Sequence, residues 1–149
     1  MSKYLEEFVV GEKYTTPART ITETDVVMFG CTTGDLHRNH MNAEAMKESQ
    51  FGQRIAHGLL GLSMAHGLFY AIDLIRDTAI AFLAVENWEF KAPIFFGDTI
   101  HCEITIADVI YSRSKHDRGV VKFKFEVYNQ NGVLTQTGIK SIMMMRKPA

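Results

Sequence analysis

The segment from Gly58 to Ile75 restricts the possible folds of this chain more than any other feature, because it reads as a helix with almost no polar face. A helix that is hydrophobic on every side must be enclosed by the rest of the protein or by lipid. The uncharged run Gly58 to Ile72 is shorter than the roughly 20 residues that a bilayer-spanning helix needs. We therefore expect a buried central helix. Its large apolar residues are Leu59, Leu60, Leu62, Met64, Leu68, Phe69, Ile72 and Ile75.

The part of the chain after this helix is patterned as strands. From Val121 to Val127, apolar and charged residues alternate, as expected for a strand with one buried face. We expect Gly97-Asp98, Asp117-Arg118-Gly119 and Asn131-Gly132 to supply the positive-φ positions that hairpin turns need. The sequence thus predicts a long antiparallel meander. Its strands are Thr78 to Phe90, Thr99 to Ser112, Gly119 to Tyr128 and Leu134 to Met145.

Helical patterns in the first half and strands in the second, with no linker or repeat between them, predict an α+β fold. A chain of 149 residues is long enough to bury a core, and we expect one domain over residues 1–149. An apolar helix followed by long antiparallel strands that curl around it describes the hot-dog architecture. The pattern also fits other α+β sandwiches.

The region before the apolar helix has weaker patterns. Lys13 to Thr20 resembles a short strand, and Thr22, with Asp25 three residues on, predicts a capped helix through Met28. Cys31 to Met41 shows no period and is expected to be a loop. Asn42 is a suitable cap for a short helix over Ala43 to Lys47, and the following segment is again irregular.

Charge and cysteine content exclude several classes of protein. Sixteen basic and seventeen acidic residues give a formal net charge of -1, without the basic excess that nucleic-acid binding requires. Cys31 and Cys102 lie far apart and form no metal-binding or disulfide pattern, so reduced thiols are expected. The first residues, MSKYLEEF, lack the apolar stretch of a signal peptide. We expect a cytoplasmic protein that binds neither nucleic acid nor membrane.

Asp35 and His40, five residues apart in the predicted loop, are the strongest candidates for chemistry. A carboxylate with a pKa of about 3.9 and an imidazole of about 6.5 can share one water molecule and exchange its protons near neutral pH. The alternative is structural: Asp35 would form a turn and His40 would cap a surface helix.

The surroundings of this pair resemble the MaoC-like (R)-specific enoyl-CoA hydratases, and the resemblance covers nearly the whole chain. It implies a hot-dog fold, an acyl-CoA thioester as substrate and no bound cofactor. The family's catalytic aspartate and histidine fall on Asp35 and His40, and its thioester-binding backbone amide falls on Gly58. The matching segments are Thr33-Gly34-Asp35, His40, Ala56-His57-Gly58, Phe90-Lys91-Ala92-Pro93 and Gly97-Asp98.

Between the paired residues, His37, Arg38 and Asn39 replace the family's Asn, Pro and aliphatic residue. Because an arginine can bind a carboxylate through two hydrogen bonds, we expect a polar or dicarboxylic acyl group to be preferred. The alternative is that Arg38 points to solvent or pairs with a coenzyme phosphate. Other candidates for the phosphates are Arg54, Lys91, Arg113 and Lys115.

Several further expectations complete the sequence-based hypothesis. A metal site at Asp35, His37 and His40 is not expected, because no second ligand cluster accompanies them. His57 is expected to bond the loop, and His66 to be a hydrogen-bonded core residue or to line an acyl tunnel. A thioesterase or a non-catalytic acyl-CoA-binding subunit remain alternative functions. A homodimer is expected, because the segment Ala79 to Val85 is apolar on both faces.

Overall fold

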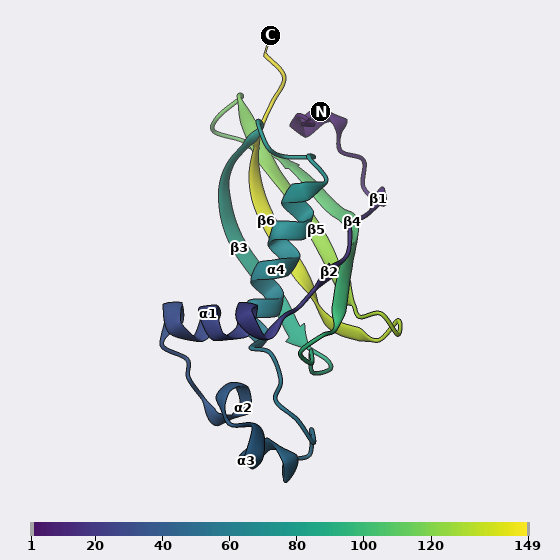
Figure 1. Cartoon of the computed structure of the whole chain (residues 1–149). Helices are drawn as coiled ribbons and strands as arrows, with labels where there is room; N and C mark the ends of the chain where they lie inside the picture. Colours follow the sequence, from purple (N-terminus) through teal and green to yellow (C-terminus); the bar gives the residue numbers. More distant parts are fainter. Residues whose placement is uncertain (1, 149) are drawn as a thin grey trace.

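The computed structural model describes residues 2–148 and consists of a curved antiparallel sheet around one long helix, α4 (Figure 1). Short helices gather at one end of α4, and the two termini lie at the other end. The elements are η1 (Leu5–Glu7), β1 (Lys13–Thr15), β2 (Arg19–Thr20), α1 (Glu23–Thr33), α2 (Arg38–Met41), α3 (Ala43–Lys47), α4 (Gly58–Ala71), β3 (Ala79–Phe90), β4 (Thr99–Tyr111), β5 (Arg118–Tyr128) and β6 (Leu134–Met145).

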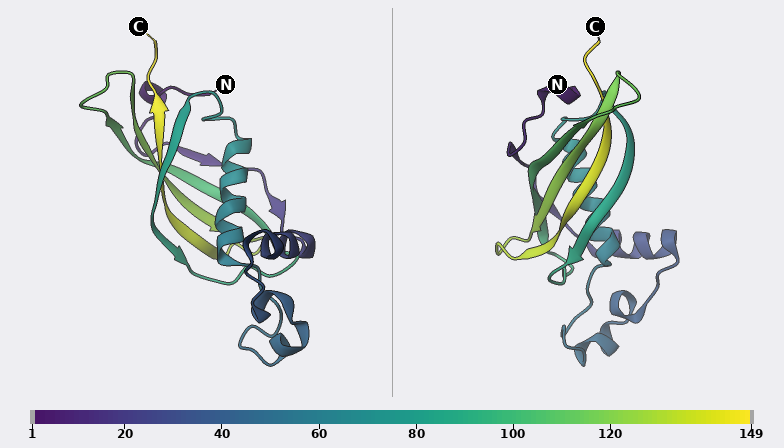
Figure 2. Two further views of the ribbon diagram at one scale, coloured as in Figure 1. Left: turned by 90° about the vertical axis from the view of Figure 1, so that its left-hand side faces the viewer. Right: turned by 180° about the vertical axis from the view of Figure 1, so that it is seen from behind.

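The sheet has the strand order β1-β4-β5-β6-β3, with β2 paired to β4. The predicted strands are therefore present, but the predicted simple meander is wrong: only β4, β5 and β6 follow one another, and β3 pairs with β6 at the far edge. Three register shifts in the β3–β6 pairing let β3 bend, as irregular pairing increases twist. A side view and a view from behind show the sheet curling around α4 (Figure 2).

The core lies between α4 and the concave face of the sheet. Phe69 of α4 packs on Phe123 and Phe125 of β5, with ring centroids 4.8 and 5.4 Å apart. All three rings are fully buried. The buried alternate residues of β5 confirm the predicted one-sided strand, and the enclosed α4 confirms the predicted central helix. Among residues 2–148, no helix is both long and apolar enough to cross a membrane.

Several boundaries differ from the sequence-based prediction. The single strand predicted over Lys13 to Thr20 is wrong in part, since it is divided into β1 and β2. Thr22 does cap α1 with Asp25, but this helix continues to Thr33 rather than ending at Met28. The predicted loop from Cys31 to Met41 is wrong in part, since it contains the end of α1 and all of α2. α4 ends at Ala71, before the predicted Ile75. The helix predicted over Ala43 to Lys47, capped by Asn42, is confirmed.

The turn glycines have two different roles. Gly97 and Gly132 have φ values of +89° and +72°, as predicted for hairpin turns. Gly119 has no positive φ, so that part of the prediction is wrong. A Cβ atom at Gly119 would lie 2.4 Å from the Ile110 carbonyl oxygen, and close packing explains this glycine instead.

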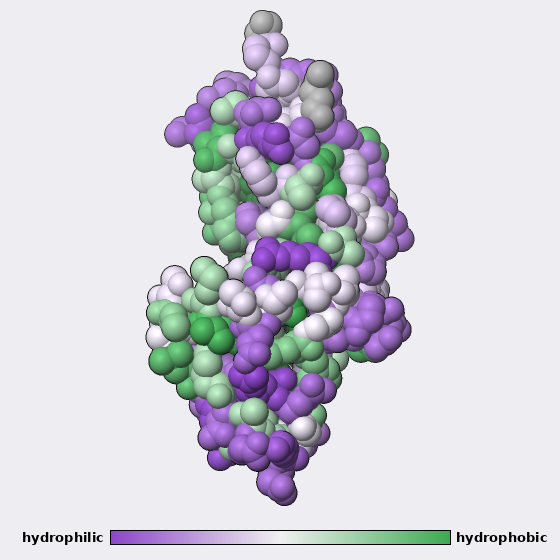
Figure 3. Space-filling view, in the orientation of Figure 1, coloured by the Kyte–Doolittle hydropathy of each residue, from purple (hydrophilic) through white to green (hydrophobic). Residues whose placement is uncertain are grey.

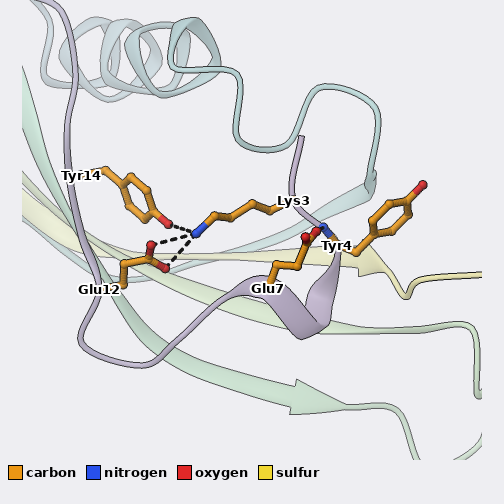
Figure 4. A network of polar contacts seen from close by, with 5 residues as sticks. All are labelled: Lys3, Tyr4, Glu7, Glu12 and Tyr14. Carbon is orange, nitrogen blue, oxygen red and sulfur yellow. Dashed lines mark hydrogen bonds and ion pairs between the residues drawn. The ribbon is translucent and has the colours of Figure 1, made fainter. Parts of the chain in front are cut away.

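The N-terminal segment is attached to the sheet by a polar network around Lys3 (Figure 4). Its ammonium donates to the Glu12 carboxylate at 2.8 Å and to the Tyr14 hydroxyl at 2.5 Å. The hydrogen bond from Lys3 lowers the pKa of Glu12. The network lies at the end of the molecule opposite the short helices, and it fixes the first strand rather than contributing to a site.

Candidate active site

The segment that follows α1 brings Asp35 to the start of α4. Gly34 ends α1 with a φ of +82°, a left-handed conformation that turns the chain sharply. Asp35 comes next, with an exposed side chain. His37 then caps α2, where its Nδ1 accepts a hydrogen bond from the backbone N–H of Asn39 at 3.2 Å. The Asp35 carboxylate accepts a hydrogen bond from the His37 backbone N–H at 3.4 Å, as in the turn considered as the structural alternative, and the residue stays exposed.

His40 lies within α2 and is 8% exposed. Its Nδ1 lies 2.7 Å from the carbonyl oxygen of Ile55. A carbonyl can only accept, so Nδ1 carries the proton and Nε2 of the neutral ring has a free lone pair. Burial lowers the pKa of His40 below its usual value of 6.5. The ring is therefore a neutral base at physiological pH.

The structure brings the predicted pair together and adds a third residue, His57. One ligand atom from each of Asp35, His40 and His57 lies within 4.8 Å of the other two. Among the described residues, this trio is the group that could hold a metal ion. A water molecule between the carboxylate and the His40 ring fits the same spacing.

Gly58 begins α4 directly after His57. The first N–H groups of a helix have no acceptor inside the helix and lie at the positive end of its dipole. A Cβ atom at Gly58 would lie 2.8 Å from the Phe90 ring, so only glycine fits here without movement of that ring. The carbonyl of Gly58 accepts a hydrogen bond from the Gln136 amide at 3.0 Å, and Trp88 donates to the same Gln136 at 3.1 Å.

A pocket of about 530 Å³ opens at this helix start. It is mostly apolar, and its polar lining residues are His57, Lys91 and Gln136. Of the four cations considered for coenzyme phosphates, Lys91 is the one that lines this pocket, where it pairs with Glu89. Its lining residues are Phe51, Ile55, Ala56, His57, Gly58, Leu59, Phe90, Lys91, Ala92, Pro93, Ile94 and Gln136.

Two residues of this site were not predicted from the sequence. Gln136 is a polar residue of β6 that is almost completely buried, with 2% exposure. Phe90 ends β3 and covers Gly58. The sequence of β6 carries no local signal for Gln136, because the next residues on the same face are Gly138 and Lys140. The sequence also does not indicate that the partner of Gln136 is Gly58, 78 residues away.

The other candidates lie apart from this pocket. Arg38 is exposed and lines a separate hollow with Asn39 and Glu48, so its predicted contact with an acyl carboxylate stays a prediction. Arg54 is already paired with Glu23 at 2.7 Å. His66 lies midway along α4, next to Phe82, and its Nδ1 is buried without a hydrogen-bond partner. The expectation of a fully hydrogen-bonded core histidine is therefore wrong.

Comparisons with known proteins agree with this geometry. The protein MaoC of Klebsiella aerogenes is 43% identical over 69% of this chain, which spans only 30% of that longer protein. An (R)-specific enoyl-CoA hydratase of Rhodospirillum rubrum is 27% identical, with 72% of each chain covered. A crystal structure titled as a monoamine oxidase regulatory protein from Archaeoglobus superposes with a TM-score of 0.90 at 33% identity, covering 99% of this chain and 97% of that one.

A family model also matches most of the chain. The family model described as the MaoC like domain matches residues 7–127, which include α1, the Asp35–His40 segment and the whole of α4. A Mycobacterium tuberculosis protein whose structure is described as a double hot-dog fold superposes with a TM-score of 0.84 at 14% identity, covering 99% of this chain and 45% of that one, so the hot-dog fold predicted from the sequence is confirmed. This chain belongs to the MaoC-like dehydratase family.

Proposed function

We propose that this protein is a hydratase/dehydratase that adds water to a trans-2-enoyl-CoA, or removes it from the (R)-3-hydroxyacyl-CoA. One observation carries the proposal. The Asp35 carboxylate and the His40 ring lie together at the start of α4, beside a mostly apolar pocket. An acyl thioester has the shape and polarity for such a pocket: an apolar chain and a single polarised carbonyl.

The protonation state of His40 suits it to receive a proton. Because Nδ1–H donates to Ile55, Nε2 is free to take a proton from water. The Asp35 carboxylate, which is exposed, can orient the same water molecule. The water oxygen bonds to C3 of the enoyl group, and its proton goes to the Asp35–His40 pair. The pair then returns a proton to C2, so the net reaction is the addition of one water molecule.

The start of α4 stabilises the charge that forms between these steps. When water adds to C3, the π electrons move toward the thioester oxygen. The free N–H of Gly58, at the positive end of the helix dipole, is placed to donate to that oxygen. The Gln136 amide bonds the Gly58 carbonyl and so holds the adjoining peptide in place. No bound cofactor takes part in this mechanism.

One alternative has a specific observation in its favour. The Archaeoglobus relative is titled a regulatory protein, which fits a subunit that binds an acyl-CoA without turnover. The presence of both Asp35 and His40 favours catalysis. A thioesterase is less well supported, because hot-dog thioesterases commonly use a carboxylate on the central helix and α4 has none.

Purified protein offered a series of trans-2-enoyl-CoA thioesters tests the proposal. Loss of enoyl absorbance with retention of the thioester supports a hydratase. Release of free thiol without hydration would assign a thioesterase, and saturable binding with neither reaction would assign a non-catalytic subunit.

The two cysteines are free, which fits the reducing cytoplasm that we propose as the location of this protein.

We also propose that the protein is a homodimer that associates through β3. β3 is an edge strand, and five of its large apolar side chains are exposed: Ile80 37%, Phe82 49%, Leu83 46%, Val85 39% and Phe90 54%. Hydrophobic surface gathers along this flank and at the outer end of α1 in the space-filling view (Figure 3). A continuous apolar edge of this kind is normally covered by a partner.

Light scattering is therefore expected to give twice the chain mass of 16.9 kDa. Leu83→Lys should weaken the dimer, because it places a charge in the apolar contact. Val133→Lys is a matched control, since Val133 is 43% exposed in the turn between β5 and β6, away from β3. A monomeric wild-type protein would contradict the proposal, and so would equal effects of the two variants.

A further inference from the structure

His57 is buried at the junction between the Asp35–His40 segment and α4, yet its side chain does not cap that helix. It occupies the cap position and is 2% exposed, but its side chain accepts no hydrogen bond from the helix. Residues at this position normally use a side-chain oxygen to satisfy a free N–H of the first turn. The first N–H groups of α4 are left open, and the His57 ring is directed to the segment before it.

Two contacts join His57 to that segment. Its Nε2 lies 2.8 Å from the backbone carbonyl oxygen of Asp35, 22 residues earlier in the chain. Its ring stacks on the His40 ring, with centroids 3.7 Å apart and an angle of 27° between the planes. The Phe29 ring packs 4.9 Å from the same imidazole. One side chain thus contacts both members of the proposed catalytic pair.

The hydrogen bond of His57 shows which ring nitrogen is the donor. The Asp35 carbonyl accepts, so Nε2 carries the proton. Nδ1 is buried and has no partner. The Nε2–H group and the ring face of His57 are therefore both engaged with the segment that carries Asp35 and His40.

We propose that His57 is a positioning residue for the Asp35–His40 pair. Its Nε2–H fixes the peptide that carries the Asp35 side chain, its ring face fixes the plane of His40, and its backbone leads directly into Gly58. His57 thereby fixes the position of the water-activating groups relative to the oxyanion-binding N–H. This inference rests on the proposed hydratase function, and its geometric part concerns contacts that exist without substrate.

Three variants separate the two contacts. His57→Gln keeps an N–H that can reach the Asp35 carbonyl and loses the ring face, whereas His57→Phe keeps the ring face and loses the donor. His57→Ala loses both. Because small displacements of reacting groups cost up to about 100-fold in rate, we expect His57→Ala to lower kcat roughly 10- to 100-fold with KM within about threefold of wild type. Gln and Phe should each recover part of kcat. His101→Gln, on β4, is the matched control and should leave kcat unchanged.

Nitrogen NMR of the free protein gives a readout that does not depend on turnover. The Leu36 amide shares its peptide group with the Asp35 carbonyl. We expect the Leu36 amide and His40 ring signals both to shift or broaden in His57→Ala. His57→Gln should restore mainly Leu36, and His57→Phe mainly His40. Thermal midpoints show whether each variant is folded. If alanine prevents folding, the other two variants are compared directly with wild type.

The outcomes distinguish the two proposals. Unchanged Leu36 and His40 signals in folded variants would overturn the role of His57, as would a kcat within twofold of wild type in an active enzyme. An increase in KM with no change in kcat would also contradict it, and would indicate a structural role in the pocket wall. If wild-type protein hydrates no enoyl thioester, the proposed function fails, and the NMR measurements alone decide whether His57 positions the pair.

Discussion

Replacing Asp35 with Asn, or His40 with Gln, is expected to lower kcat for enoyl-CoA hydration by about 10² or more. Each variant keeps the shape and part of the hydrogen bonding of the original residue but removes its capacity to hold or transfer a proton. Asp35 is exposed, and His40 contacts the Ile55 carbonyl through the nitrogen that is not proposed to act. The loss should therefore appear in kcat rather than in folding.

The double variant tests whether the two residues act on one water molecule. Groups that work as a unit have non-additive effects, so the double variant should be about as slow as the slower single variant. Asp108→Asn and His101→Gln, both on β4, are matched controls and should retain full activity. A single variant with near-normal kcat would exclude that residue from the chemistry, and multiplicative losses would contradict a shared water.

Replacing Lys140 with Met is expected to increase the free energy of unfolding at pH 7 by about 1 to 3 kcal/mol. Lys140 lies on β6 and is fully buried under α4. Its ammonium donates to the Leu62 carbonyl at 3.2 Å and lies 4.5 Å from the Phe125 ring centre. These contacts do not offset the loss of hydration, since burial lowers its pKa from 10.5 to about 8. Methionine has similar length and carries no charge.

The pH dependence gives this prediction a definite sign. Between pH 8 and 10.5 the unfolded chain keeps the Lys140 proton that the folded protein has lost, so the wild type gains stability as pH rises. Burial also raises the pKa of Cys102 from 9.0 to about 12, which lowers stability above pH 9. The two effects nearly cancel between pH 9 and 10.5. A net rise is therefore expected only from pH 8 to 9, by roughly 0.6 kcal/mol, because Lys140 contributes about 1.0 kcal/mol and Cys102 removes about 0.4 kcal/mol.

Urea unfolding at pH 7, 8 and 9 measures this effect as a difference between the variant and wild type. The difference in free energy of unfolding between Lys140→Met and wild type should be largest at pH 7 and smaller at pH 9, because folded wild type loses the Lys140 proton above about pH 8. Taking the difference reduces the contribution of groups that both proteins contain. Lys124→Met is the matched control: Lys124 is exposed on β5, and its replacement should change stability by less than about 0.5 kcal/mol. A destabilised Lys140→Met at every pH would show that the buried ammonium contributes net stability.

The elements that could be predicted from the sequence are those whose patterns are local. The alternation in β5 and the all-round hydrophobicity of α4 are set by their own burial, so both were correctly placed. The end of α4 was placed too late because the apolar pattern continues beyond the helix. Leu74 and Ile75 are buried, at 8% and 5% exposure, but they follow Asp73, whose φ of +62° lies outside helical geometry.

Contacts between distant segments could not be predicted in the same way. Glycine is unfavourable inside a helix, yet α1 continues through Gly30. A Cβ atom at Gly30 would lie 2.6 Å from the end of the Met41 side chain. Close approach of α1 to α2 selects glycine at this position. The position of β3 beside β6 depends on pairing across more than forty residues, about which local periodicity carries no information.

In the candidate site, too, local features could be predicted from the sequence and contacts between distant segments could not. Asp35 and His40 are close in sequence, and their spacing predicted that they could share a water molecule. The contact between His57 and the Asp35 carbonyl joins residues 22 apart, and the Gln136 contact to Gly58 joins residues 78 apart. These contacts depend on how the short helices dock at the start of α4. The sequence predicted the candidate reacting groups, and the structure shows which residues contact them.

Incubation of the protein with crotonyl-CoA in D₂O, with chiral analysis of the product, tests the central claim most directly. The proposed mechanism predicts (R)-3-hydroxybutyryl-CoA with one deuterium at C2 and an intact thioester, and it predicts that Asp35→Asn and His40→Gln abolish most of this product. A folded wild-type protein that forms the (S) isomer, releases free coenzyme A without hydration, or hydrates equally well without Asp35 and His40 would contradict the account.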